Sequence, residues 1–194
     1  LTFPVPEVSV RVAERFTAFL PVAYKHHCPE IRLDIALVID GSSSMRAAAG
    51  GGGTKLEAAV HAAKVFLANL RLPGDRVAVV AFSGEATTVS ALSGDLGVLT
   101  RALDALPTGS GTRIDLGLAA AAAALGERTP NRLPAIILLT DGQPSGTTPA
   151  AVREAAAAIR SRGIVIYTIG LGPDADLALL SDVAGSPARA FGAP

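Results

Sequence analysis

From residue 31 onward, apolar runs alternate with amphipathic segments along the chain. The apolar runs have the lengths of buried strands and lie at 33–39, 76–82, 133–140 and 164–169. The segments between or after them have helical composition and lie at 54–70, 95–106, 113–126, 149–162 and 176–184. This alternation predicts an α/β domain with a mainly parallel sheet that helices cover on both faces.

Local signals define several of these elements. A short strand at 87–92 follows the strand at 76–82 so closely that no crossover helix fits between them, which predicts an antiparallel edge strand. Thr54 and Glu57 stand at the N-cap and N3 positions of a capping box. A last strand is expected near 188–191.

The first thirty residues are less regular. Residues 8–12 alternate as a strand does, whereas 16–22 are apolar with no clear period. Because so short a segment cannot bury a core of its own, we expect 1–30 to be an extension that packs on the main domain, 31–194.

Composition excludes some classes of partner. The chain has 194 residues, 49% of them hydrophobic and 18% charged, and its formal net charge is zero. It therefore lacks the basic character of nucleic-acid or anionic-membrane binders, and its apolar runs are too short for direct membrane insertion. It opens on Leu1 with no charged-then-apolar leader, so we expect a soluble fragment or a processed form.

Cysteine and histidine provide no evidence for a zinc site. Cys28 is the only cysteine, so no disulfide can form within the chain. His26 and His27 precede it, but no second ligand pair has zinc-like spacing, and His61 lies in a predicted helix.

Oxygen-bearing side chains follow two of the buried strands. Asp40 comes directly after the first apolar run, Ser42 and Ser44 alternate with it, and Asp141 directly follows the run at 133–140. Ligands of open α/β sheets bind beyond the carboxyl ends of the strands, where strand order reverses. If the two strands are neighbours, both carboxylates meet in one crevice, and the loop that holds Thr112 reaches the same place.

These residues resemble a known family. Asp40-x-Ser42-x-Ser44, Thr112 in the segment 111–117 and Asp141 in 140–142 are similar to the metal-ion-dependent adhesion site of von Willebrand factor type A (vWA) domains. The match covers about residues 31–191 and fills all five motif positions in order. It implies a three-layer, doubly wound, Rossmann-like fold whose mainly parallel sheet has one antiparallel edge strand.

The resemblance also implies a ligand set for Mg²⁺, with Mn²⁺ or Ca²⁺ as alternatives. Ser42 and Ser44 would bind through their hydroxyls, Thr112 directly in one conformational state, and Asp40 and Asp141 mostly through water. Neutral hydroxyls quench the ion's charge poorly, so an Asp or Glu of a partner protein is the expected sixth ligand. These domains often carry another helix after the last strand, and the sequence ends at Pro194, so affinity switching through such a helix is left open.

An enzyme is the less favoured interpretation. A haloacid-dehalogenase-type phosphatase needs a second Asp two residues after the nucleophile, and that position holds Ser42. Residues 53–55 have the composition of a phosphate loop in the wrong order, and no histidine lies near the motifs to act as a base. We therefore expect a binding module.

Three kinds of module remain open. One is an extracellular or cell-surface adhesion domain, which is the expected location. Another is a cytoplasmic domain that docks a metal-bridged partner onto a larger machine such as a chelatase or ATPase. The third is a metal-free scaffold of the same fold. The oligomeric state is left open.

Two local features lie beside the motifs. Arg113 is expected to be an exposed residue in the first turn of its helix, and the alternative is that it lines the rim and selects an acidic partner. The alanine- and glycine-rich run 47–53 predicts a flexible loop, and the alternative is that this loop also shapes partner choice.

Overall fold

The computed structural model of the chain describes residues 7–12, 16–21, 31–49 and 52–193. The chain divides into two compact units, residues 1–30 and 31–194. In the first unit, β1 (Glu7–Val12) pairs antiparallel with β2 (Phe16–Pro21). Packing of this unit on the main domain stays a prediction, and Cys28, His26 and His27 lie outside the described residues.

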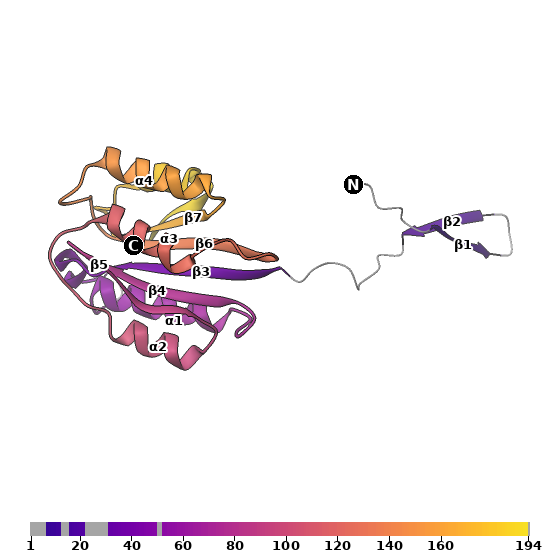
Figure 1. Cartoon of the computed structure of the whole chain (residues 1–194), viewed down its shortest axis with the longest axis horizontal. Helices are drawn as coiled ribbons and strands as arrows, with labels where there is room; N and C mark the ends of the chain where they lie inside the picture. The colour runs from indigo at the N-terminus through magenta and orange to yellow at the C-terminus, as the bar shows by residue number, and fades with distance from the viewer. Residues whose placement is uncertain (1–6, 13–15, 22–30, 50–51, 194) are drawn as a thin grey trace. The chain divides into compact units, whose positions relative to one another are not determined.

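The second unit is built on a six-stranded sheet with the order β5-β4-β3-β6-β7-β8 (Figure 1). Its strands are β3 (Arg32–Asp40), β4 (Arg76–Phe82), β5 (Ala86–Ser93), β6 (Arg132–Thr140), β7 (Val165–Leu171) and β8 (Ala190–Ala193). Neighbouring strands are parallel except β4 and β5, which are antiparallel. The expected sheet and its antiparallel edge are therefore confirmed.

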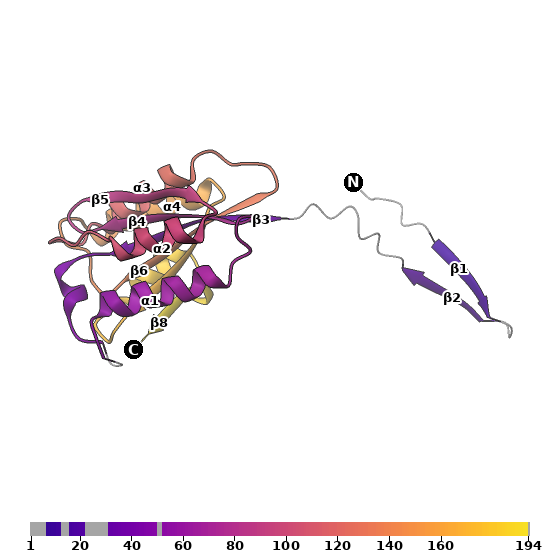
Figure 2. The ribbon, with the colours of Figure 1, turned by 90° about the horizontal axis from the view of Figure 1, so that it is seen from below.

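Helices cover both faces of this sheet. They are α1 (Lys55–Ala68), α2 (Leu96–Asp104), α3 (Ile114–Leu125), α4 (Pro149–Ser161) and α5 (Leu177–Ala184), with short 3₁₀ turns at η1 (Ser43–Arg46) and η2 (Pro187–Arg189). The helices α1 and α2 lie on one face, and α3 and α4 lie on the other (Figures 1 and 2). Among the described residues, no helix has the length and apolar character needed to cross a bilayer.

The central strand β3 is buried on both faces. Ile35, Leu37 and Ile39 join the core under α1 and α2, whereas Ala36 and Val38 join the core under α3, α4 and α5. A shift of one residue would exchange these two sets of side chains, so packing fixes the register. The strand therefore delivers its last residue to a defined place at the sheet edge.

The helix α1 begins at the predicted capping box. The Thr54 hydroxyl accepts the backbone N–H of Glu57 at 3.2 Å, and the Glu57 carboxylate accepts the backbone N–H of Thr54 at 2.7 Å. Two of the unpaired donors at the start of the helix are thus satisfied. This cap fixes Lys55 as the first residue of α1.

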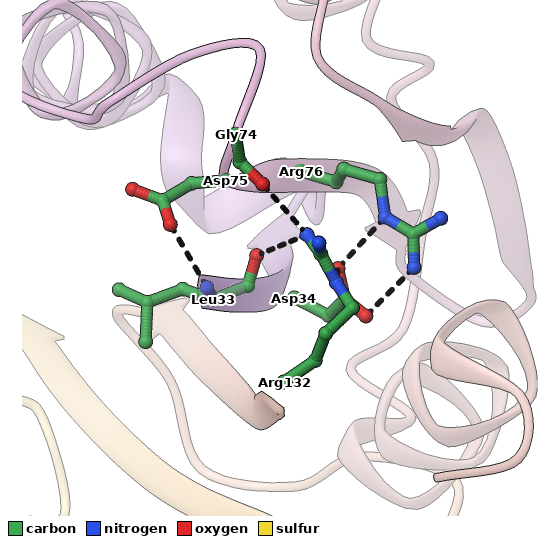
Figure 3. Close-up of polar contacts among 6 residues, drawn as sticks. All are labelled: Leu33, Asp34, Gly74, Asp75, Arg76 and Arg132. Carbon is green, nitrogen blue, oxygen red and sulfur yellow. Dashed lines mark hydrogen bonds and ion pairs between the residues drawn. The ribbon is translucent and has the colours of Figure 1, made fainter. Parts of the chain in front are cut away.

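The amino-terminal ends of three strands are joined by a buried carboxylate. Asp34 accepts hydrogen bonds from Arg76 at 2.8 and 2.9 Å and from Arg132 at 2.8 Å (Figure 3). Asp75 accepts the backbone N–H of Leu33 at 2.8 Å in the same cluster. Burial raises the pKa of Asp34, but the two guanidinium groups outweigh burial and leave that pKa below its ordinary value.

Candidate metal centre

The two strands that carry the predicted carboxylates are neighbours. In the register of β3 with β6, Ile39 lies beside Leu139, so Asp40 at the end of β3 and Asp141 directly after β6 come at the ends of adjacent strands. Strand order also reverses at this pair, because β4 and β5 lie on one side and β7 and β8 on the other. The predicted residues therefore lie at the topological switch point of the sheet.

Asp40 is held in place by its neighbours. It is fully buried, with one carboxylate oxygen accepting the backbone N–H of Ser42 at 2.8 Å and the other accepting the Thr140 hydroxyl at 2.6 Å. Burial raises the pKa of Asp40, and the hydrogen bonds from Ser42 and Thr140 oppose that rise. A nearby cation would offset the cost of this buried negative charge.

A chain of hydrogen bonds links the first motif to the second aspartate. The Ser42 and Ser44 hydroxyl oxygens are 2.9 Å apart, and the Ser44 hydroxyl donates to Asp141 Oδ1 at 2.8 Å. Ser42 and Asp141 are buried, whereas Ser44 is exposed. This cluster of oxygen donors therefore has an inner side against the sheet and an outer side that is open to solvent.

Thr112 lies on a separate loop that reaches the same place. Its backbone exchanges hydrogen bonds with that of Ser145, at 3.3 and 3.0 Å, which ties its loop to the segment after β6. A Cβ atom built on Gly142 would be 3.9 Å from Thr112 Oγ1 and 4.0 Å from Ser44 Oγ. The hydroxyl of Thr112 makes no hydrogen bond with any other described residue, so it is available to a ligand.

The loop before Thr112 packs closely on the first motif. The backbone N–H of Gly109 donates to the carbonyl oxygen of Gly41 at 2.9 Å. A Cβ atom at Gly41 would collide with the carbonyl oxygen of Pro107, so only glycine allows this approach. The five predicted positions are thus brought together by three loops that also contact one another.

Lys55 is a member of this cluster that the sequence analysis missed. Its ammonium lies 2.9 Å from Asp141 Oδ2, and the side chains of Lys55 and Asp141 are 13% and 1% exposed. The sequence did hold a signal, since a lysine in the first turn of a helix opposes the helix dipole and therefore calls for a partner. The contact shows that Asp141 uses its two oxygens differently, one for Ser44 and one for Lys55.

Comparison with known proteins identifies the family. The sequence pattern of the von Willebrand factor type A domain matches residues 34–194. The chain belongs to this family. Among curated proteins no sequence matches this vWA chain.

Solved structures agree with this assignment. Proximal thread matrix protein 1 from the mussel byssus, whose metal-ion-dependent adhesion site holds zinc, is 27% identical with a TM-score of 0.72, over 84% of this chain and 42% of that one. A vWA protein from Catenulispora acidiphila is 28% identical with a TM-score of 0.68, over 79% and 36%. This chain spans less than half the length of either protein. BatB from Bacteroides thetaiotaomicron, at 19% identity and a TM-score of 0.71 over 82% and 88%, supports the fold alone.

The donor set of this vWA domain fits a divalent cation that prefers oxygen. It offers two carboxylates and three hydroxyls from Asp40, Asp141, Ser42, Ser44 and Thr112. Within the described ranges, no group of three His, Cys, Asp or Glu side chains gathers in one place, so hydroxyls must supply much of any ligation. Oxygen donors of this kind suit Mg²⁺, Mn²⁺ or Ca²⁺.

Arg113 is engaged by its own helix. Its guanidinium donates to Asp115 from Nε at 2.9 Å and from Nη2 at 2.7 Å, and this pairing lowers the pKa of the Asp115 carboxyl. The side chain of Arg113 is 31% exposed, so it is less open to solvent than expected. Selection of an acidic partner by Arg113 stays a prediction.

The ends of the alanine- and glycine-rich loop are tied by backbone hydrogen bonds. The backbone N–H of Ala49 donates to the carbonyl oxygen of Gly53 at 2.9 Å, and the backbone N–H of Lys55 donates to the carbonyl oxygen of Ala47 at 3.0 Å. Residues 50 and 51 lie outside the described part of the chain. A role of this loop in partner choice stays a prediction.

Proposed function

We propose that this vWA domain holds a divalent cation, with Mg²⁺ the first choice, and uses it to bind an Asp or Glu side chain of a partner protein. The ligands are Asp40, Ser42, Ser44, Thr112 and Asp141. The hydrogen-bond chain from Ser42 through Ser44 to Asp141 is the observation that supports this best, because it gathers oxygen donors from two distant loops. Domains of this family typically mediate protein interactions.

The chemistry of the donors explains the choice of partner. A divalent cation bound here would attract an anionic oxygen, since three of its five protein donors are neutral hydroxyls. Ser44 is exposed, so an incoming side chain can approach the set from solvent. A partner carboxylate would supply a further anionic oxygen ligand for the cation.

The zinc-occupied site of the mussel protein adds support. That protein is 27% identical to this chain, and its metal site is the same kind that the present motif resembles. It makes a divalent cation a reasonable expectation here. Hard oxygen donors and the reluctance of Mg²⁺ to lose all its water favour Mg²⁺ or Mn²⁺ for this set.

Two other roles are compatible with the same fold. A cytoplasmic docking domain of a chelatase or ATPase assembly would use the same metal centre with a different partner, and a metal-free scaffold would not use it at all. We favour a non-enzymatic role in each case. An extracellular or cell-surface location remains a prediction.

Calorimetry tests the metal centre. Metal-stripped protein is titrated with MgCl₂ and MnCl₂, beside Asp141→Ala and the matched control Asp182→Ala, whose side chain is 52% exposed and pairs with Arg153. We expect saturable one-to-one binding in the wild type and in Asp182→Ala, and loss of it in Asp141→Ala. No heat and no thermal stabilisation in the wild type would refute the metal centre.

A further inference from the structure

The ammonium group of Lys55 forms an ion pair with one carboxylate oxygen of Asp141, a predicted metal ligand. Lys55 Nζ lies 2.9 Å from Asp141 Oδ2, while Ser44 Oγ lies 2.8 Å from Asp141 Oδ1. The Lys55 side chain is only 13% exposed, so this is a largely desolvated ion pair and not a surface contact. The set of charged groups here is thus two carboxylates, those of Asp40 and Asp141, and one ammonium.

Two separate elements shape the place that this ammonium occupies. The capping box and the hydrogen bond from Lys55 N to Ala47 O fix the start of α1, from which the side chain reaches Asp141. Gly172, directly after β7, lies beside the end of this side chain. A Cβ atom there would be 3.1 Å from both Cε and Nζ of Lys55. Glycine at this position therefore leaves the room that the lysine side chain uses.

The location is unfavourable for a lysine in the absence of Asp141. The first turn of a helix carries a partial positive charge, which disfavours a second positive charge. Burying an ammonium adds a desolvation cost that only a well-placed partner offsets. Lys55 therefore depends on Asp141, and its charge acts on whatever Asp141 binds.

We propose that Lys55 sets the charge balance of the metal centre: it weakens cation binding and strengthens the hold of the loaded domain on an anionic ligand. This inference rests on the proposed function. With Asp40 and Asp141 ionised, the two carboxylates and the Lys55 ammonium together have one net negative charge. A bound divalent cation changes this to one net positive charge. A single carboxylate then brings the set to neutrality. Without Lys55 the loaded set is already neutral, and a carboxylate adds an uncompensated negative charge.

Lys55 also orients its partner. By occupying Oδ2, the ammonium leaves Oδ1 of Asp141 facing Ser44 and the other predicted ligands. A second partner that fixes the orientation of a ligating carboxylate is a common feature of metal sites. Removal of Lys55 therefore changes both the charge and the orientational freedom of Asp141, and the two effects have opposite signs for metal affinity.

The experiment compares Lys55→Met with Lys55→Arg and the wild type. Methionine keeps an unbranched side chain of similar length without the charge, and arginine keeps the charge. Mn²⁺ affinity is measured by calorimetry on metal-stripped protein, in chloride buffer and in acetate buffer of equal ionic strength. If charge dominates, Lys55→Met binds Mn²⁺ on the order of tenfold more tightly than the wild type in chloride.

Acetate serves as the probe for a partner carboxylate. Coupling between two ligands is reciprocal, so acetate that binds the loaded site raises Mn²⁺ affinity by the same factor by which Mn²⁺ raises acetate affinity. We expect this factor to be larger in the wild type and in Lys55→Arg than in Lys55→Met. Equal factors in all three proteins would overturn the proposal.

The outcomes separate this inference from the proposed function. Asp141-dependent Mn²⁺ binding in the wild type with equal or weaker binding by Lys55→Met would leave the metal centre intact and refute the charge-setting role of Lys55. No binding by either protein would refute both. Thermal stability gives a further readout. If Lys55 has only a structural role, Lys55→Met should have both a lower melting temperature and weaker Mn²⁺ binding than the wild type. Our proposal instead predicts that Mn²⁺ raises the melting temperature of Lys55→Met more than that of the wild type.

Discussion

Ser44 donates a hydrogen bond from its hydroxyl to Asp141 Oδ1 at 2.8 Å, although 97 positions separate the two residues. The contact exists because β3 and β6 are adjacent and parallel, with Ile39 beside Leu139 at their ends. It makes the serine motif after β3 and the aspartate after β6 parts of one cluster.

Ser44→Ala tests the contact itself. The metal-free protein should lose about 1 kcal/mol of unfolding free energy with the hydrogen bond, and Mn²⁺ affinity should fall about tenfold or more with the lost ligand. Denaturant unfolding and calorimetry measure the two effects. Ser161→Ala is the control, since its hydroxyl bonds only to the carbonyl of Ala158 on an exposed helix surface. Unchanged Mn²⁺ affinity in Ser44→Ala would exclude Ser44 as a ligand.

Thr112 provides a matched pair of variants. Thr112→Val keeps the branched shape and removes the hydroxyl, whereas Thr112→Ser keeps the hydroxyl. We expect Thr112→Val to weaken Mn²⁺ binding about tenfold and Thr112→Ser to change it little. Calorimetry on both proteins decides, and similar losses in both would mean that packing of Thr112 matters and its hydroxyl does not.

Gly142→Ala places a methyl group between two predicted ligands. The new Cβ would be 3.9 Å from Thr112 Oγ1 and 4.0 Å from Ser44 Oγ, which is ordinary van der Waals contact. We therefore expect the fold to keep its stability to within about 0.5 kcal/mol while Mn²⁺ binding weakens. Melting temperature and calorimetry, measured on the same sample, show whether the two properties separate as expected.

Gly41→Ala, in contrast to Gly142→Ala, should lower the stability of the fold. A Cβ there would collide with the carbonyl oxygen of Pro107, so the loop before Thr112 must move. We expect a loss of about 1–3 kcal/mol of unfolding free energy even without metal. Retention of full stability would show that this loop adjusts freely, and would weaken the case for a preformed site.

Asp34→Asn tests the cluster at the far end of the sheet. The pKa of Asp34 is lowered in the folded protein, so its contribution is fully present above the ordinary aspartate value of about 3.9 and is lost as pH falls through the lower folded value. We expect the variant to lose about 3 kcal/mol at pH 7, since two arginines lose their charged acceptor. The difference from wild type in denaturant unfolding should shrink below pH 4. A difference that does not depend on pH would contradict this linkage.

The sequence predicted the sheet well because its strands are strongly patterned. The apolar runs at 33–39 and 133–140 became β3 and β6 with ends shifted by at most one residue. The short link before 87–92 was enough to predict the antiparallel edge strand, β5. By contrast, β2 (Phe16–Pro21) was missed, because an apolar run without alternation does not distinguish a strand from other buried segments.

Asp40, Ser42, Ser44 and Asp141 could be predicted to lie together because they come at the ends of two apolar runs, and the resemblance to the vWA motif added Thr112. Two contacts could not be predicted in the same way. The pairing of Lys55 with Asp141 depends on where a long, flexible side chain points, and the cluster around Asp34 depends on the neighbourhood of β3, β4 and β6. Such contacts between distant residues follow from side-chain geometry that no local pattern specifies.

A crystal structure of the domain soaked in Mn²⁺, with anomalous diffraction used to locate the ion, tests the metal centre most directly. We expect one strong anomalous peak within direct coordination distance of the Ser42 and Ser44 hydroxyls, and no such peak in Asp141→Ala crystals. A peak at another place, or none at a Mn²⁺ concentration that saturates related sites, would contradict this expectation.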